Sequence, residues 1–387
     1  MEVKKLKECC TIIAGQSPES KYYNSNGDGL PFFQGKADFG ELYPSIRVYC
    51  SQPTKIAEKD DILLSVRAPV GPTNLAPCKV CIGRGLTAIR PSEVLLTRYV
   101  LLFFRYFEAQ LASKGTGTTF KAITQDVVKN LEIPIPPLPE QERIVARIEE
   151  LFSQLDAGVE TLEKTKAQLV VYRQAVLKEA FEGDYPRKQL KEFSKAISGF
   201  AFKSSRYSPD GNYVVVKIGN VKERHFDFSR DLTKTLEADD SILEKYLLRR
   251  GDCLITLTGS RGKRDYGFVA MVGNQNNYLL NQRVAALRFD QSVALPEFFQ
   301  YYLASPSYRG MFFGYETGNV GQGNVGIKAL LDPYVILPDI DTQKRIVEDV
   351  EDRLSVCDSI EQTVDTALQQ AEAMRQSILK DAFEGRL

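Results

Sequence analysis

The sequence predicts an α+β protein with an internal two-fold repeat. Two globular regions of mixed α and β structure are expected, joined by a pair of long antiparallel helices that form a coiled coil. Three observations predict this fold. A segment near the middle of the chain recurs at its end, both copies carry apolar residues at heptad spacing, and short β-like runs precede each copy.

The repeat can be followed along most of the chain. Shifted by 202 positions, Gln141–Gly183 aligns without a gap to Gln343–Gly385, with 17 identities in 43 positions. Farther upstream, LKECCTIIAG at 6–15 resembles LKEFSKAISG at 190–199, and DILLS at 61–65 resembles DCLIT at 252–256. Because the order is kept while the shift changes, the chain is a tandem duplication whose loops differ in length.

Each copy ends in a predicted helix of about 43 residues, or ~65 Å at 1.5 Å per residue. Proline-rich sequence precedes the first helix, and Gly183 and Gly385 supply the left-handed cap of the two. Apolar residues recur in steps of four and three, a stripe too narrow for a broad core. The two helices are therefore expected to pack on each other; the alternative is that each packs on its own globular half. The predicted seam consists of Ile144, Ile148, Leu151, Leu155, Leu162, Leu169, Tyr172, Val176, Ile346, Val350, Ile360, Val364, Met374 and Ile378.

Short β-like runs separated by turn-rich loops precede each helix, together with one aromatic-rich helical stretch, at 99–111 and 296–303. The aromatic residues of these stretches are expected in the cores rather than stacked on bases. The predicted organisation is a globular region at 1–138, a central helix at 139–184, a second globular region at 185–340 and a C-terminal helix at 341–387.

Composition is that of an ordinary globular protein, with 43% hydrophobic and 26% charged residues. The chain shows no apolar run of membrane-spanning length and no signal peptide, so a cytoplasmic location is expected. Seven scattered cysteines are expected as reduced packing residues. Cys78 and Cys81 form one CxxC, but there is no second such pair and His225 is the single histidine, so no metal site is predicted.

The charges are unevenly distributed although the formal net charge is zero. The two predicted helices are acidic, which leaves 38 basic against 30 acidic residues in the globular regions. Such a surplus can attract phosphates. The densest basic loop, TGSRGKRDYG at 258–267, carries Arg261, Lys263 and Arg264, whereas its counterpart SVRAPVGPTN carries only Arg67. A solvated turn is the alternative interpretation of this loop.

No catalytic residue is predicted. A single histidine nearly excludes catalytic triads. GQGNVG at 321–326 matches G-x-G-x-x-G formally, but it follows an aromatic stretch rather than a clear strand. There is no G-x-x-x-x-G-K-[ST] motif and no amino-methyltransferase motif. The sequence therefore indicates a binding protein without a catalytic centre of its own.

The whole chain resembles the specificity subunit of type I restriction-modification enzymes. The junction IPIPPLPEQERIVARIEELF at 133–152 and the ending LKEAFEG at 177–183 carry this resemblance most specifically. The second junction, ILPDIDTQKRIV, departs from the pattern by losing most of the prolines. The resemblance implies that the globular regions are target recognition domains, and that the helices space them and bind two modification (methyltransferase) subunits. Restriction subunits would join them, and S-adenosylmethionine, ATP and Mg would be held only in partner subunits.

The leading hypothesis is recognition of a bipartite double-stranded DNA site, one half by each domain. A non-catalytic adaptor that binds proteins is the alternative, and a standalone enzyme with an unrecognised site is a third possibility. The predicted DNA-binding residues are Lys36, Arg67, Arg84, Lys114, Thr116, Thr118, Lys121, Lys203, Arg224, Ser260, Arg261, Lys263, Arg264, Arg283, Gln322 and Asn324.

Overall fold

The computed structural model describes residues 2–115, 122–235, 239–318 and 321–387, which form two compact units. Unit 1 comprises Met1–Glu163 and Asp365–Leu387, and unit 2 comprises Lys164–Val364. Each unit therefore holds one globular region together with part of both long helices, rather than ending where a helix begins. The reason lies in the cores described below, which include side chains from the helix ends.

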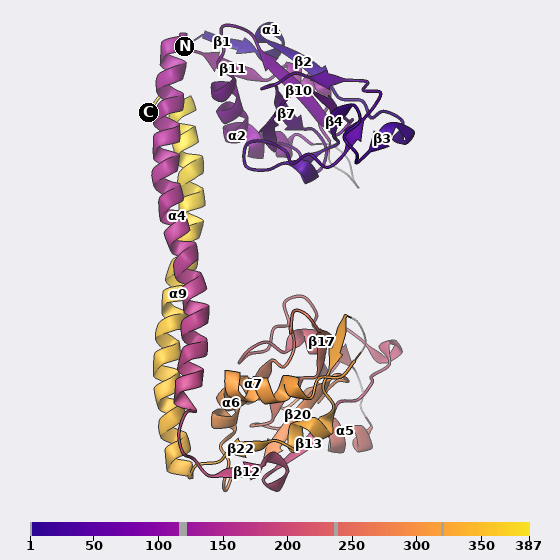
Figure 1. The fold of residues 1–387 in the computed structure, drawn as a ribbon, viewed down its shortest axis with the longest axis vertical. Coiled ribbons are helices and arrows are strands. Elements are labelled where there is room, and N and C mark those ends of the chain that lie inside the picture. Colours follow the sequence, from indigo (N-terminus) through magenta and orange to yellow (C-terminus); the bar gives the residue numbers. More distant parts are fainter. Residues whose placement is uncertain (1, 116–121, 236–238, 319–320) are drawn as a thin grey trace. The chain divides into compact units, whose positions relative to one another are not determined.

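The two long helices are α4 (Leu138–Ala180) and α9 (Ile340–Phe383), and each contributes to both units (Figure 1). They run antiparallel within each unit. In unit 1, Arg375 of α9 pairs with Asp156 of α4. In unit 2, Arg173 pairs with Asp358 and Glu179 pairs with Arg353, so numbers that rise along α4 meet numbers that fall along α9. The long antiparallel helices predicted from the repeat are confirmed.

The contact stripe between the helices differs from the predicted seam at three positions. Tyr172, Ile360 and Met374 are exposed, at 45%, 40% and 53%, so they are not buried in the seam as predicted, although Tyr172 interacts with Arg353 of α9. The partly buried side chains lie one position later, at Arg173, Glu361 and Arg375. A stripe chosen by hydrophobicity missed them because long charged side chains can bury their stems while pairing their charged ends. The other predicted positions are buried or partly buried: Ile144, Ile148, Leu151, Leu155, Leu162, Leu169, Val176, Ile346, Val350, Val364 and Ile378.

The globular region of unit 1 contains a four-stranded antiparallel sheet in the order β2-β10-β7-β8 and a five-stranded sheet in the order β3-β5-β4-β9-β6. Strands β4 and β9 are parallel, and β1 pairs with β11. The strands are β1 (Glu2–Lys5), β2 (Cys10–Ala14), β3 (Tyr23–Asn24), β4 (Leu30–Phe33), β5 (Tyr49–Cys50), β6 (Ile56–Ala57), β7 (Ile62–Ser65), β8 (Thr73–Leu75), β9 (Val80–Ile82), β10 (Leu86–Pro91) and β11 (Glu132–Ile135). The shorter helices are α1 (Leu6–Cys9), α2 (Thr97–Ser113) and α3 (Gln125–Lys129).

The globular region of unit 2 repeats this plan. Its antiparallel sheet has the order β13-β20-β16-β18, and β14 lies parallel to β19 in a second sheet with β15. The strands are β12 (Arg187–Gln189), β13 (Ser194–Ser198), β14 (Tyr213–Val216), β15 (Lys234–Thr235), β16 (Cys253–Thr256), β17 (Thr258–Ser260), β18 (Val269–Met271), β19 (Tyr278–Leu280), β20 (Val284–Phe289), β21 (Gln322–Asn324) and β22 (Tyr334–Ile336). The shorter helices are α5 (Asp240–Tyr246), α6 (Pro296–Ala304), α7 (Pro306–Gly314) and α8 (Ile327–Leu331). The α+β class and the internal repeat are thus confirmed.

The main core of each unit joins its globular region to the helix pair. In unit 1, aromatic residues of α2 pack with Ile144 and Ile148 of α4 and with Leu379 of α9. In unit 2, aromatic residues of α6 pack with Val176 of α4 and Val350 of α9. Each large apolar side chain that is fully buried stabilises the folded state by about 1.5–3 kcal/mol. The helix ends are therefore integral parts of the two cores.

A buried glutamine fixes the start of each long helix to its globular region. Gln141 accepts a hydrogen bond from the Leu96 amide (2.9 Å) and donates to the carbonyls of Val94 and Pro136. Its counterpart Gln343 makes the same three bonds, to Leu295, Val293 and Pro338, at 2.8 Å each. Both glutamines are 0% exposed. The polar backbone next to each helix start is thereby satisfied without water.

Within the described residues, no helix is long and apolar enough to cross a membrane. All seven cysteines are free thiols. The described part of the chain contains no group of three or more His, Cys, Asp or Glu side chains arranged to hold a metal ion.

Candidate nucleic-acid interface

An ion pair between a buried aspartate and a partly exposed arginine links the two central strands of each antiparallel sheet. Arg90 of β10 donates two hydrogen bonds of 2.8 Å to Asp61, which precedes β7. Arg288 of β20 donates two bonds of 2.7 Å to Asp252, which precedes β16. The hydrogen bonds to the aspartates raise the pKa of both arginines, so both guanidinium groups stay charged. The opposite ends of these strands carry the candidate interface.

In unit 1, three exposed cations converge on one polar pocket of about 200 Å³, here called the Lys36 pocket. Lys36 follows β4, Arg67 follows β7, and Arg84 lies between β9 and β10. Two of these loops approach closely at Gly85, where a Cβ would lie only 2.2 Å from the Gln34 carbonyl oxygen, so only glycine fits there. The rest of the lining consists of Ser17, Gln34, Gly35, Ser65, Ala68 and Gly85. Three positive side chains around small polar groups suit a phosphate or a guanine edge.

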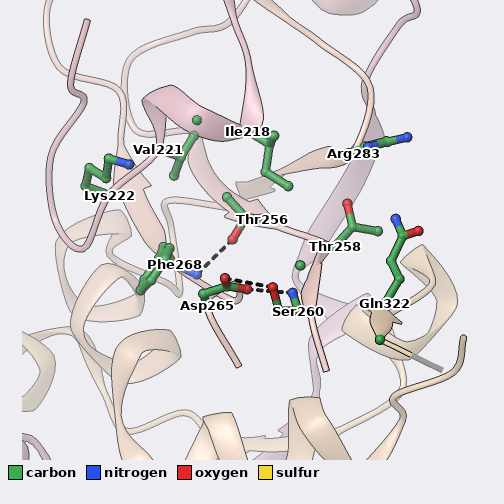
Figure 2. A pocket seen from close by; sticks show the side chains of 13 residues that line it. Ile218, Val221, Lys222, Thr256, Thr258, Ser260, Asp265, Phe268, Arg283 and Gln322 are labelled. Atoms are coloured by element: carbon green, nitrogen blue, oxygen red, sulfur yellow. Dashed lines mark hydrogen bonds between the residues drawn. The ribbon is translucent and has the colours of Figure 1, made fainter. Parts of the chain in front are cut away.

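In unit 2, a larger pocket of about 450 Å³, here called the Arg283 pocket, has a mixed lining (Figure 2). Arg283 and Lys222 supply positive charge, while Gln322, Thr258 and Ser260 supply amide and hydroxyl groups. The backbone of Arg283 is left-handed, with φ of +68°, a region that residues other than glycine rarely occupy. Asp265 also lines the pocket, and its carboxylate accepts a 2.6 Å hydrogen bond from the Ser260 amide. That bond is the main cause of the lowered pKa of Asp265.

The two pockets occupy the same place in the repeat. Ser65 ends β7 and Thr256 ends β16, and each belongs to its pocket. The next residues make equivalent backbone bonds of 2.9 Å, from Val66 to Gly85 and from Leu257 to Arg283. One fold therefore presents two pockets of different size and chemistry. This difference is what recognition of two unlike DNA sequences requires.

In the loop 258–267, the densest basic stretch of the sequence, both arginines are exposed and contact other residues of the same globular region. Arg261 forms an ion pair with Glu316 at 3.3 Å. Arg264 places its guanidinium 4.9 Å from the ring centroid of Phe313. Lys263 is exposed, and its side chain makes no hydrogen bond or ion pair with the described residues. Among the loop residues predicted for DNA, only Ser260 lines the Arg283 pocket.

The remaining predicted residues are dispersed. Lys114 directly follows α2 and has its ammonium over the Phe107 ring, at 5.4 Å from the centroid. Lys203 is exposed, and Asn324 belongs to β21, next to Gln322 at the rim of the Arg283 pocket. Arg224 does not line the Arg283 pocket, and its guanidinium pairs with Asp358 of α9 at 3.3 Å. Thr116, Thr118 and Lys121 lie outside the described residues.

Several pocket residues were not predicted. Ser17 and Gln34 line the Lys36 pocket, and Lys222 and Thr258 line the Arg283 pocket. The similarity of DILLS to DCLIT did relate Ser65 to Thr256, the strand-end residues that line the two pockets. Nothing in the sequence placed Ser17 or Lys222 beside those strand ends, because they come from distant loops.

Comparison with known proteins agrees with this architecture. A model of the type I restriction modification DNA specificity domain matches residues 1–169 and 182–370. A putative type I restriction enzyme MjaX specificity subunit of Methanocaldococcus jannaschii is 42% identical over 163 residues, covering 41% of this chain and 38% of that protein. The EcoKI specificity subunit of Escherichia coli K12 is 27% identical over 332 residues, covering 80% of this chain and 70% of that protein.

Solved structures show the same fold. A chain from a structure described for complex assembly and conformational transition of the type I R-M system superimposes with a TM-score of 0.77, at 20% identity, over 100% of this chain and 98% of that one. The HsdS subunit of Thermoanaerobacter tengcongensis superimposes with a TM-score of 0.54, at 21% identity, over 100% and 97%. Because the family model matches both halves of the duplicated sequence, the chain belongs to the type I restriction modification DNA specificity family.

Proposed function

We propose that this chain is the specificity subunit of a type I restriction-modification complex, in which each globular region recognises one half of a bipartite DNA site. One observation carries the proposal: the Lys36 pocket and the Arg283 pocket lie at equivalent places of a duplicated fold but differ in lining. A pocket with three cations, and a larger pocket with two cations, a carboxylate and apolar side chains, would contact different base edges and phosphates. The family match supports DNA recognition over the adaptor hypothesis.

In this proposal the globular regions 1–138 and 185–340 act as target recognition domains, and α4 and α9 set the distance between the half-sites. The outer faces of these helices, rich in Asp and Glu, suit modification (methyltransferase) subunits better than DNA. The chain is non-catalytic by itself. S-adenosylmethionine, ATP and Mg would belong to modification and restriction subunits, and the cytoplasm is the compartment in which the complex would meet its DNA.

Sequencing of modified bases in host DNA, with the chain present and deleted, tests the proposal. The expected result is one bipartite motif whose adenine methylation disappears on deletion and returns on complementation. Complementation with Arg84→Ala should lower methylation through effects on one half-site, and Arg283→Ala through effects on the other. A methylation pattern that is the same with and without the chain would refute the proposal.

A further inference from the structure

A short hairpin at residues 221–226 carries Arg224 and contacts two functional parts of unit 2. Lys222, near its start, lines the Arg283 pocket. Two residues later, Arg224 donates from Nη2 to the Asp358 carboxylate on α9. The hairpin is closed by a bond of 3.0 Å from the Lys222 amide to the His225 carbonyl. One short segment therefore connects the candidate DNA pocket to a long helix.

The ion pair at the tip of this hairpin also involves α4. The same Asp358 oxygen accepts a 2.7 Å hydrogen bond from Arg173, which also pairs with Glu361 at 2.7 Å. The Arg224 side chain is 26% exposed, so its charge is partly withdrawn from water. The backbone of Arg224 is left-handed, with φ of +67°, and its amide donates to the Val269 carbonyl at 2.7 Å. Because its backbone is fixed in this way, Arg224 directs its side chain toward α9.

This contact is a second attachment of the globular region to the helix pair. The first attachment is the buried Gln343 and the apolar core that reaches Leu354. Asp358 lies four residues beyond Leu354 along α9, or ~6 Å at 1.5 Å per residue. The ion pair therefore extends the attachment by about one helical turn past the apolar core, and this longer contact opposes a tilt of the region on the helix pair.

The second attachment is polar rather than tightly packed. A cavity of about 450 Å³ lies between the hairpin and the helices, lined by residues such as Val170, Gln174 and His225. Because apolar packing is incomplete there, the Arg224–Asp358 pair provides a specific link. Its loss would therefore change orientation more than it changes folding.

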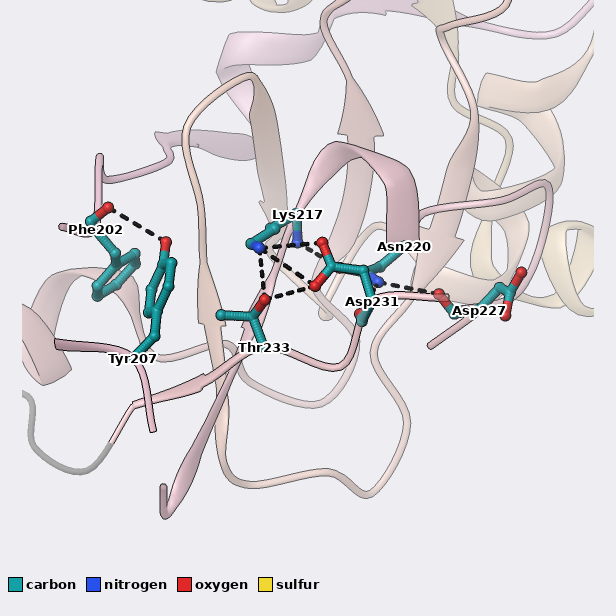
Figure 3. A network of polar contacts seen from close by, with 7 residues as sticks. All are labelled: Phe202, Tyr207, Lys217, Asn220, Asp227, Asp231 and Thr233. Atoms are coloured by element: carbon teal, nitrogen blue, oxygen red, sulfur yellow. Dashed lines mark hydrogen bonds and ion pairs between the residues drawn. The ribbon is translucent and has the colours of Figure 1, made fainter. Parts of the chain in front are cut away.

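The hairpin belongs to a longer loop at residues 217–233, here called the braced loop, and side-chain hydrogen bonds join the two ends of this loop (Figure 3). Lys217 donates to Asp231 at 3.0 Å and to Thr233 at 2.5 Å, which ties the two ends of the loop together. Asn220 donates to the carbonyls of Asp227 (3.0 Å) and Asp231 (2.8 Å). A loop with these internal bonds moves as one piece, so a displacement at Arg224 also displaces Lys222.

Unit 1 offers a natural comparison. An equivalent cavity of about 370 Å³ is lined by Arg375, Gln376 and Leu379, the counterparts of Arg173, Gln174 and Leu177. The facing loop contributes Lys36 and Glu41. Among the described residues, however, no ion pair joins residues 34–48 to α4 or α9. An ion pair between the unit 1 globular region and a long helix is instead formed by Arg98 of α2 and Glu149 of α4, at 3.9 Å. Attachment through the hairpin is thus a feature of unit 2.

We infer that Arg224 is a positioning residue: through Asp358 it holds the second recognition domain at a set angle on α4 and α9, and thereby restricts the gap between half-sites that the complex accepts. The inference rests on the proposed function. It replaces the role in DNA contact that the sequence predicted for Arg224.

The test uses the full chain in complex with its modification subunits. Duplexes carry the two half-sites identified from host methylation, with the natural gap or with one base pair added or removed. Arg224→Ala should reduce the preference for the natural gap by about twofold to fivefold, as expected from losing one partly exposed ion pair. The base preferences within the half-site read by unit 1 should not change. Arg224→Lys should retain part of the gap preference.

Two further variants separate this role from general effects. Asp358→Asn removes the partner on α9 and should reproduce the altered gap preference. Arg230→Ala removes an exposed cation of the same loop, outside the pocket lining, and should behave as wild type. Should Arg224→Ala fail to fold, Arg224→Lys and Asp358→Asn carry the test.

The outcomes are distinguishable. An unchanged gap preference in both Arg224→Ala and Asp358→Asn would overturn the inference, as would an equal loss of binding at all gap lengths. The latter result would instead indicate direct DNA contact by Arg224. A wild-type complex that does not discriminate sequence at all would contradict the proposed function itself.

Discussion

Arg173 of α4 donates a hydrogen bond to Asp358 of α9 across 2.7 Å, and the residues 202 positions away repeat the pairing as Arg375 with Asp156. The duplicated sequence thus builds the same inter-helix ion pair in each unit. Because each arginine needs its own aspartate, a shift of one helix along the other by a heptad would break both pairs. These pairs therefore specify the antiparallel register that a purely apolar stripe leaves open.

Replacing Arg173 by Met should weaken this helix pairing. The arginine is 17% exposed and holds two carboxylates, which would be left facing each other. We expect a loss of about 1 kcal/mol, because the partners are partly exposed to water. Urea unfolding followed by far-UV circular dichroism measures the change. Arg147→Met is the matched control, since its pair with Glu150 lies within one helix turn and should contribute ~0.5 kcal/mol or less. Equal effects of the two variants would contradict this assignment.

Replacing Gln343 by Leu should be more damaging. The change leaves the Leu295 amide and the carbonyls of Val293 and Pro338 without their partner in a dry site. An unsatisfied buried polar group costs about 1–3 kcal/mol, so a loss of about 2 kcal/mol or more is expected in unfolding measurements. Gln154→Leu, at an exposed position of α4, should change stability little. If the two substitutions prove equivalent, the buried glutamine has no anchoring role.

Removing a cation from the Lys36 pocket should alter the salt dependence of DNA binding. In Arg84→Ala, the slope of log K against log salt should become shallower by about one, because one phosphate contact is lost. Binding titrations of the complex at several salt concentrations measure the slope. Lys7→Ala removes an exposed cation of α1 outside the pocket and should keep the wild-type slope. The same slope in both variants would argue against a pocket contact with DNA.

Stability of the braced loop should depend on pH through Asp231. The Thr233 hydroxyl, and then the Lys217 ammonium, lower the pKa of this carboxyl. A lowered folded-state pKa contributes stability above the unfolded value of about 3.9, and that stability is lost as the pH falls through the folded value. The difference in thermal midpoint between wild type and Asp231→Asn should therefore be largest near neutral pH and shrink below about pH 4. A difference that grows on acidification would contradict the brace.

Thr233→Val provides the matching check on the cause. The substitution removes the largest contribution to the lowered pKa of Asp231, so it should reduce the pH dependence seen in wild type. Adding Thr233→Val to Asp231→Asn should have little further effect on that dependence, because both act on the same network.

The long helices were predictable because their evidence is local and periodic. Each is marked by apolar residues at heptad spacing and by a terminal glycine. Because the segment occurs twice, the same pattern in one copy supports the helix predicted for the other. The phase of the seam was less secure, since adjacent stripes differ by one residue. Tyr172 is more apolar than Arg173, yet Arg173 faces the partner helix, because two carboxylates are available there.

The amino-acid sequence by itself determined that this protein is a duplicated α+β chain with paired helices, because a repeated segment and its periodicity can be recognised without coordinates. Tertiary structure decided which polar residues act together. The Lys36 pocket draws its side chains from four separate segments, those of Ser17, Lys36, Arg67 and Arg84. The pairing of β4 with β9 and of β7 with β10 brings the loops after these strands together. Arg224 likewise meets Asp358 only through the fold, because 134 residues of chain separate them.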